Sequence, residues 1–143
     1  MKARFSLWGP TIFAAAMAFV ETASVVTLKR LYFPEGWAAP FHAIPPEGLL
    51  LEQCREIATL VMIAAVAFLG RPKLAEGIAR GLWIFGVWLL LYYFFLRVLT
   101  GFPARLTDLD VVFLVPRTWI APVWLPLASA SLSLILALKL RPR

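Results

Sequence analysis

The sequence predicts an all-α membrane protein: a single domain over residues 1–143, in which four transmembrane helices form a bundle with two proline- and aromatic-rich outer loops. Three observations predict this fold. The 143 residues are 62% hydrophobic and only 15% charged, with a mean hydropathy of +0.82, unlike a soluble domain. Four apolar stretches each have roughly 20 residues, the length of a membrane-spanning helix. Segments rich in proline, glycine and charge separate them. In lipid the backbone must satisfy its own hydrogen bonds, so these stretches are expected to be helices.

The first span is expected over about residues 8–31. Glu21 is its one charged interruption. The basic pair Lys29 and Arg30 marks the exit from the membrane, and Pro34-Glu35-Gly36 ends the helix. A basic start before an apolar core is also the pattern of a secretory signal peptide. The apolar run continues past any cleavage site of that kind, which favours a span.

The second span is expected over about residues 49–70, after a stiff loop (34–48) that contains four prolines. Trp37 and Phe41 of this loop are expected at the membrane interface or under another loop. A short basic loop over residues 71–80 then leads to the third span.

The third span, about residues 81–99, is rich in aromatic side chains. The second long loop, 101–118, follows it. The apolar run 111–115 inside this loop is too short to cross a membrane, so it is expected to dip into the interface or pack over the helix ends. The fourth span is expected over about residues 119–138. Two prolines lie in its first two turns, so that end is expected to be kinked or to start late.

The distribution of charge predicts the orientation. Four spans put both termini on the same side as the loop over residues 71–80. The basic residues of that side outnumber its single acid, Glu76; they are Lys2, Arg4, Arg71, Lys73, Arg80, Lys139, Arg141 and Arg143. Basic and acidic residues balance on the other side. Because an excess of lysine and arginine marks the cytoplasmic side, both termini are expected in the cytoplasm.

Ionisable residues gather at the outer end of the second span. Glu52, Arg55 and Glu56 are spaced i, i+3, i+4, which places them on one helix face. Glu21 lies eleven residues before Tyr32, roughly 16 Å along the helix axis. It is therefore inside the apolar slab, where a carboxylate that faces lipid costs several kcal/mol. Arg55 is the partner that we expect for Glu21.

These residues predict one of two arrangements. The first is a polar pocket open to the outer face, since ionisable residues inside a membrane are functional candidates by default. The second is a structural network of ion pairs that sets the helix register. The candidate residues are Glu21, Arg30, Glu52, Arg55, Glu56, Tyr92, Tyr93, Arg97, Asp108 and Asp110.

Several classes of site have no support in the sequence. The net charge is +6, but the basic residues flank apolar helices instead of forming a nucleic-acid-binding face. The only histidine, His42, cannot supply both axial ligands of a haem. No CxxC, HExxH, nucleophile-elbow or phosphate-loop motif occurs. A carboxylate metal site is conceivable, but nearby arginines match the acids. We therefore expect no cofactor and no metal.

Four stretches carry a resemblance to a known kind of protein. They are FVETASVVTLKRLYFPEG (19–36), EQCREIATLVMIAAVAFLG (52–70), FGVWLLLYYFFLRVLTGFP (85–103) and DVVFLVPRTWIAPVWLP (110–126). Together they resemble small, uncharacterised bacterial four-span membrane proteins over most of the chain. The resemblance implies a four-helix protein of the bacterial cytoplasmic (inner) membrane, and it implies no activity. In such proteins the position after Trp88 is often acidic; here it is Leu89, which weakens any site shared with the third span.

Three functional hypotheses remain. The favoured one is a non-catalytic accessory or structural subunit that lies in the lipid bilayer and packs against other membrane chains or copies of itself. The second is a small transporter or binder of an anion or lipid headgroup, which would use Arg55 and Arg97 with Glu21 as a proton-coupled carboxyl group. The third is an enzyme on a lipid-linked substrate at the outer leaflet, with Glu21 or Glu56 as acid or base. We lean against an enzyme.

Overall fold

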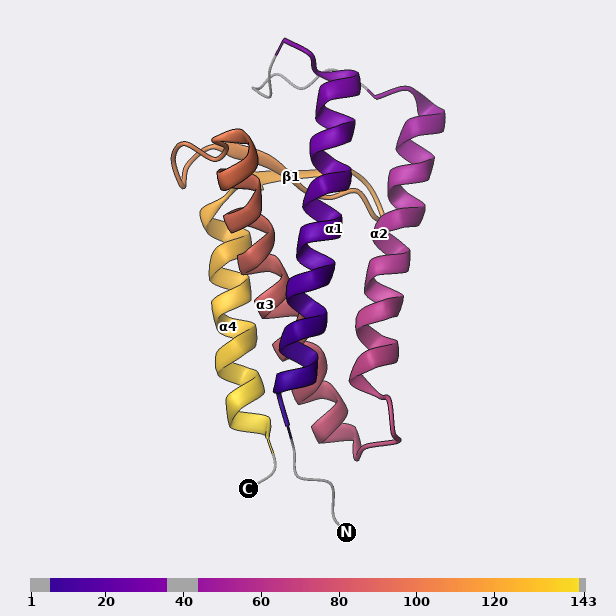
Figure 1. Ribbon diagram of the computed structural model, residues 1–143, viewed down its shortest axis with the longest axis vertical. Coiled ribbons are helices and arrows are strands. Elements are labelled where there is room, and N and C mark those ends of the chain that lie inside the picture. The colour runs from indigo at the N-terminus through magenta and orange to yellow at the C-terminus, as the bar shows by residue number, and fades with distance from the viewer. Residues whose placement is uncertain (1–5, 36–43, 142–143) are drawn as a thin grey trace.

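The computed structural model of the chain describes residues 6–35 and 44–141. They form four helices, α1 (Trp8–Tyr32), α2 (Pro46–Ala67), α3 (Leu74–Thr100) and α4 (Trp124–Leu140), and two strands, β1 (Leu109–Phe113) and β2 (Trp119–Pro122), as Figure 1 shows. The all-α, four-helix architecture is therefore confirmed. Among the described helices, α1 and α3 are long and apolar enough to cross a membrane. Trp37, Phe41 and His42 lie outside the described residues.

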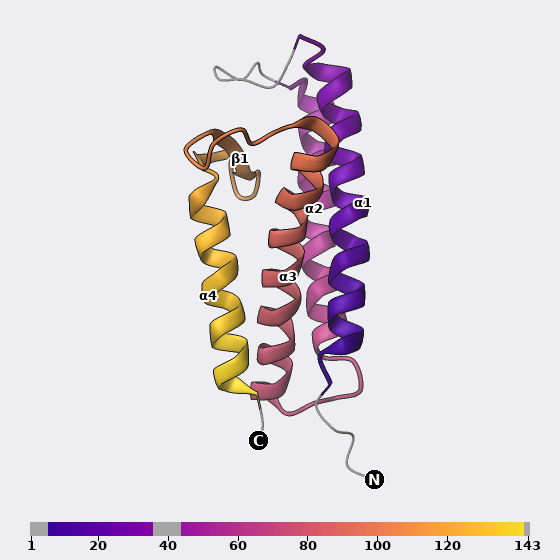
Figure 2. The same cartoon turned by 60° about the vertical axis from the view of Figure 1, so that its left-hand side comes forward.

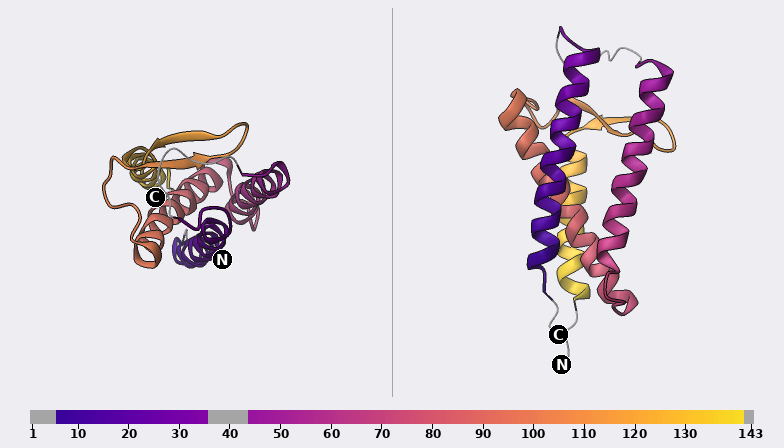
Figure 3. Two further views of the ribbon diagram at one scale, coloured as in Figure 1. Left: turned by 90° about the horizontal axis from the view of Figure 1, so that it is seen from above. Right: turned by 45° about the vertical axis from the view of Figure 1, so that its right-hand side comes forward.

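The helices run alternately up and down, and the hairpin lies across one end of the bundle. α1 starts and α4 finishes at the same end, where the turn between α2 and α3 also lies (Figures 1 and 2). The hairpin and the last turn of α1 lie toward the other end. α3 occupies the centre and packs against α1, α2 and α4 (Figure 3). The topology therefore puts the basic 71–73 turn on the side of the termini.

The third helix begins one to two turns earlier than expected. Residues 74–80, which we expected to be a loop, form its first turns after Pro72 and Lys73. A hydrogen-bonded ion pair between Arg80 and Glu76 (2.5 Å, i,i+4) stabilises these turns. We had placed the start of this helix at the start of its apolar run. A helix can begin before its apolar region, as this one does. The helix ends as expected, at Gly101 in the left-handed region (φ +77°).

The fourth helix begins later than expected. Residues 119–122, which we assigned to its first turn, form strand β2 instead. They pair antiparallel with β1, with Asp110 opposite Ala121. Pro126 then lies in the first turn of α4, where an N–H group is not needed. The late start of α4 agrees with the expectation drawn from its two prolines. The hairpin was not expected, because the apolar run 111–115 was treated as part of a loop.

The packing between α3 and α4 depends on small residues. A Cβ atom added to Gly86 would lie 2.8 Å from the backbone oxygen of Ala130. Ala130 itself is fully buried, and Ala137 nearly so. Close approach of two backbones at small residues is typical of helix pairs in membranes.

The outer surface of the helices is unusually apolar, and several polar and charged side chains lie inside an otherwise apolar core. Large apolar side chains are exposed on the outward faces of all four helices, including Phe19, Val61, Phe94 and Leu132. The buried polar and charged residues, by contrast, are Thr22, Lys29, Glu52, Glu56, Thr59, Asp110 and Ser133. Most of these buried polar groups lie in the half of the bundle that carries the hairpin.

Candidate functional site

A cavity of about 330 Å³ lies between α1, α2, α3 and the hairpin. Its walls come from residues 21–33, 44–56, 88–93 and 110–120. The hairpin reaches across from the top of α4 to α2, and so covers one flank of the space beside α1 (Figure 3). Most of the lining is apolar, and a few ionisable side chains converge on it. This combination is typical of small-molecule sites in proteins, although the volume is at the small end of their range.

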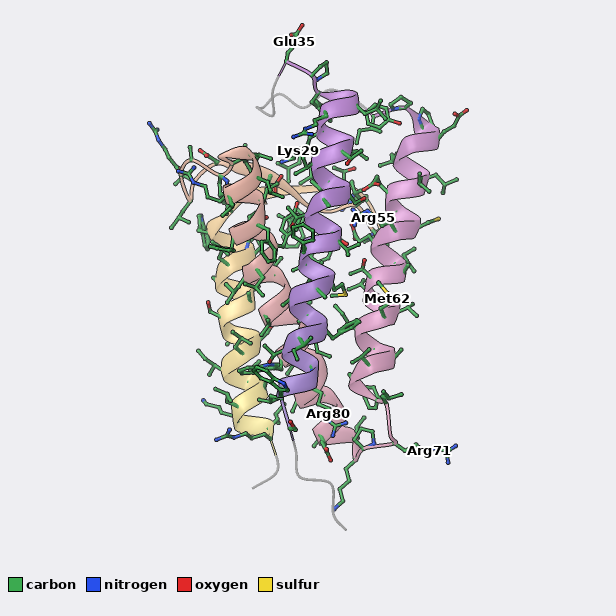
Figure 4. The ribbon with its side chains drawn as sticks, viewed as in Figure 1. Lys29, Glu35, Arg55, Met62, Arg71 and Arg80 are labelled. Atoms are coloured by element: carbon green, nitrogen blue, oxygen red, sulfur yellow. The ribbon has the colours of Figure 1, made fainter. Side chains whose placement is uncertain are left out.

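Arg55 joins two helices through two carboxylates. Its Nη1 group makes an ion pair with Oε1 of Glu21 on α1. Its Nε and Nη2 groups donate to Oε2 of Glu52, at 2.9 and 2.7 Å. Figure 4 shows Arg55 between α1 and α2. The Thr59 hydroxyl donates to the other oxygen of Glu21 at 3.2 Å. The expected pair of Glu21 and Arg55 is therefore present, and Arg55 is already shared by two acids.

Glu56 holds the hairpin against α2. Its carboxylate accepts hydrogen bonds from the backbone N–H groups of Leu114 (2.8 Å) and Val115 (3.3 Å). One helical turn away, the Gln53 amide donates to the carbonyl oxygen of Leu114 at 3.2 Å. These bonds satisfy the polar backbone where β1 ends, and they keep the hairpin over the cavity. Glu56 thus acts here as an anchor of the hairpin.

A second polar group lies where the hairpin meets α3. Asp110 is only 2% exposed, and the Tyr93 hydroxyl donates to it at 3.2 Å. Lys29 is also buried; its Nζ atom lies 4.4 Å from the ring centroid of Phe102. In Figure 4 Lys29 lies on the side of α1 away from Arg55. Two basic side chains thus line the cavity, Lys29 from α1 and Arg55 from α2.

Two aromatic donors complete the wall on α3. The ring of Tyr92 packs edge-on against Tyr93, with 5.0 Å between centroids. Trp88 is 5% exposed, and within residues 6–35 and 44–141 no group accepts a hydrogen bond from its buried indole N–H. A buried donor of this kind costs free energy unless an acceptor reaches it.

Three of the expected residues do not join this cavity. Arg97 donates to the carbonyl oxygens of Gly101 and Pro103, so it caps the end of its own helix. Asp108 accepts from the backbone N–H groups of Ala104 and Arg105, both at 2.8 Å, and so holds the loop turn. Arg30 is exposed and lines a separate groove with Thr100 and Phe102. None of these three candidates lines the cavity, because Arg97 and Asp108 bond to local backbone groups and Arg30 lies on another face of α1.

The sequence analysis missed Lys29 and Trp88. Lys29 was interpreted as a marker of the membrane boundary, although it lies about two turns after Glu21 and lines the same cavity. Trp88 was counted among the packing aromatics. Its position one turn before Tyr92 placed it on the face that lines the cavity. The hairpin N–H groups that bind Glu56 had no signal in the residue pattern, because they depend on the fold of residues 109–122.

The described side chains define what the cavity can bind. Two of the described cations, Lys29 and Arg55, border it, together with four carboxyl groups: Glu21, Glu52, Glu56 and Asp110. No group of three or more His, Cys, Asp or Glu residues in the described part of the chain could hold a metal ion. The second functional hypothesis needed a cationic site for an anion. The structure gives this hypothesis less support, because Arg55 already pairs with two acids and Arg97 does not line the cavity.

Comparison of the chain with protein-family models, with characterised proteins and with solved structures finds no match.

Proposed function

We propose that this chain is an integral membrane protein that binds a small molecule in the cavity beneath the hairpin. All four helices span the bilayer in this proposal. The observation that supports membrane insertion is the number of large apolar side chains exposed on the outside of the helices, while Lys29, Glu52, Glu56 and Asp110 are buried inside. In water such a surface would be an aggregation hazard, whereas in lipid it is the expected exterior.

The charges of α2 are compatible with a span. Glu52 and Glu56 are buried, and both are paired within the protein, as is Arg55. The opposite face of this helix presents apolar side chains such as Ile57 and Val61. α4 has 17 residues, about 26 Å at 1.5 Å per residue. Its length therefore comes close to the thickness of the hydrocarbon core.

The proposed orientation follows from the basic end of the bundle. The turn with Arg71 and Lys73 lies on the side of both termini. By the positive-inside rule this side faces the cytoplasm, and the hairpin faces outward. The cavity would then lie in the outer half of a bacterial cytoplasmic membrane.

Binding is supported by one observation above all: a mostly apolar cavity on which ionisable side chains from α1, α2 and the hairpin converge. The test is purification from native membranes in mild detergent, followed by mass spectrometry of the small molecules that co-purify. Leu89 lines the cavity and is 6% exposed, so a larger side chain at this position tests whether the molecule binds there. We expect Leu89→Trp to fill the cavity and to lose the bound molecule while the protein stays folded. A bound molecule retained in that variant would place the binding site elsewhere.

A second candidate function is the accessory subunit. It is favoured by α2, which packs mainly against α3 and leaves a broad apolar face exposed, including Leu50 and Leu51. A helix with so little of its surface covered can accept another membrane helix. The same purification tests this function. A partner chain at fixed stoichiometry, lost when the apolar face of α2 is altered, would support it.

A further inference from the structure

Four of the ionisable groups that line the cavity already have partners within the protein. Arg55 bonds to both Glu21 and Glu52, so these three side chains form one ion-paired group between α1 and α2. The carboxylate of Glu56 accepts hydrogen bonds from two backbone N–H groups of the hairpin. The protein itself therefore stabilises these four groups, and none of them depends on a ligand.

The other two charged side chains on the described walls act on each other. Lys29 and Asp110 attract one another electrostatically, and the Tyr93 hydroxyl donates to Asp110 at 3.2 Å. A ligand charge brought into a mostly apolar cavity would lose its hydration and find these groups already engaged. The arrangement therefore favours a ligand whose buried part is uncharged.

Much of the remaining lining is hydrocarbon. It includes Val25 and Leu28 of α1, Leu49 of α2, Leu89 of α3 and Val111 of the hairpin. Walls of this kind offer water few hydrogen bonds, whereas an alkyl chain gains dispersion contacts along its whole length. The cavity of about 330 Å³ has room for a segment of such a chain.

The cavity lies where α1 and α2 face each other. Each of these helices packs against α3 more than against the other, and the side chain of Arg55 lies between them (Figure 4). Glu21 is the lining residue furthest from the end of α1, so its ion pair with Arg55 forms a floor. Beyond this floor, Val25, Leu28 and Leu49 line the cavity and are only half-buried. This geometry indicates an opening between the two helices, toward the lipid of the proposed membrane.

We infer that the cavity takes up an alkyl chain of a membrane phospholipid, which enters from the outer leaflet between α1 and α2. The headgroup stays at the membrane surface, so only uncharged hydrocarbon is buried. This inference rests on the proposed binding function and names the chemical class of its ligand. Lipid chains surround the opening at high concentration, so a modest affinity is enough to fill the cavity. A free fatty acid carries the same chain, and the test therefore includes both sources.

The test uses Trp88 as a reporter, because it lines the cavity and is only 5% exposed. Bromine atoms on an acyl chain quench tryptophan fluorescence only at short range. The full chain, with Phe in place of every tryptophan except Trp88, is reconstituted in nanodiscs of phosphatidylcholine with ordinary or brominated chains. We expect Trp88 to lose most of its fluorescence in the brominated lipid. Unchanged fluorescence would overturn the inference.

A matched pair of double variants shows whether the quenching chain lies in the cavity. Val25→Phe with Leu89→Phe adds two rings to the cavity walls and is expected to restore most of the fluorescence. Val20→Phe with Leu99→Phe makes the same changes on the outside of α1 and α3, where these side chains are 68% and 45% exposed, and is expected to leave the quenching unchanged. Equal quenching in both double variants would overturn the inference, because the bromine would then act from outside the bundle.

Two further measurements cover the source of the chain and the folding of the variants. A brominated fatty acid is added to nanodiscs of ordinary lipid. Quenching by the fatty acid, with none by the brominated phospholipid, would overturn the phospholipid as the source. If the variant with one tryptophan fails to fold, non-denaturing mass spectrometry of the unaltered chain and of Leu89→Trp compares the phospholipid that each retains. We expect the unaltered chain to retain more, and equal retention would overturn the inference.

The two levels of proposal fail in different ways. A co-purified molecule without an alkyl chain, lost in Leu89→Trp while Trp88 stays unquenched, would overturn the lipid chain and leave the binding function intact. No molecule lost in Leu89→Trp, together with no quenching of Trp88, would overturn both.

Discussion

Removal of Arg55 is the sharpest test of how the bundle is held together. The Arg55→Met variant keeps the apolar stem and deletes the three donors that reach Glu21 and Glu52. The side chains of these two acids are only 11% and 8% exposed, so water cannot replace the lost partner well. Loss of one partner from a buried ion pair costs about 3–5 kcal/mol. Because one of the two acids can take up a proton, we expect the free energy of unfolding to fall by about 3 kcal/mol.

The measurement is unfolding in mixed micelles with increasing sodium dodecyl sulfate, followed by circular dichroism. The triple variant Glu21→Gln, Glu52→Gln, Arg55→Met removes the two charges that the single variant leaves behind. It is expected to unfold within about 1 kcal/mol of the unaltered chain. Arg97→Met is the matched control, with an expected loss of about 1 kcal/mol or less, because Arg97 is exposed and bonds only to nearby carbonyls. A triple variant no more stable than Arg55→Met would refute the argument.

Three further predictions concern packing, the hairpin and orientation. Gly86→Val is expected to lower the free energy of unfolding by about 1–3 kcal/mol, and Gly86→Ala by less, because any Cβ meets the α4 backbone; equal stability of all three would contradict this. Glu56→Ala is expected to speed hydrogen exchange at the Leu114 amide about tenfold or more, without the same change in α4, since a bond to a charged acceptor contributes about 1.5–3 kcal/mol. In a background without the native cysteine, an impermeant maleimide is expected to label Glu35→Cys from outside and Lys73→Cys only from the cytoplasmic side; the reverse pattern would invert the proposed orientation.

The site was predictable where it depends on spacing along one helix. Glu52, Arg55 and Glu56 share a face because of their i, i+3, i+4 spacing, and the structure keeps them together. The pairing of Glu21 with Arg55 was also expected, since a carboxyl group inside an apolar helix needs a partner. Arg97 and Asp108 could not be placed in this way. Their nearest partners are backbone groups of a loop whose path the residue pattern does not specify.

The sequence by itself determined that the chain forms four helices, with Glu52, Arg55 and Glu56 together toward one end. Length, hydropathy and the breaks at proline and glycine suffice for this, because they act locally along the chain. Only the tertiary structure decided that residues 109–122 form a hairpin, that this hairpin is anchored on Glu56, and that Lys29 and Trp88 face the same cavity. The hairpin depends on pairing between two short segments, and its anchoring on Glu56 joins segments more than 50 residues apart. The periodicity of one segment carries no information about such contacts.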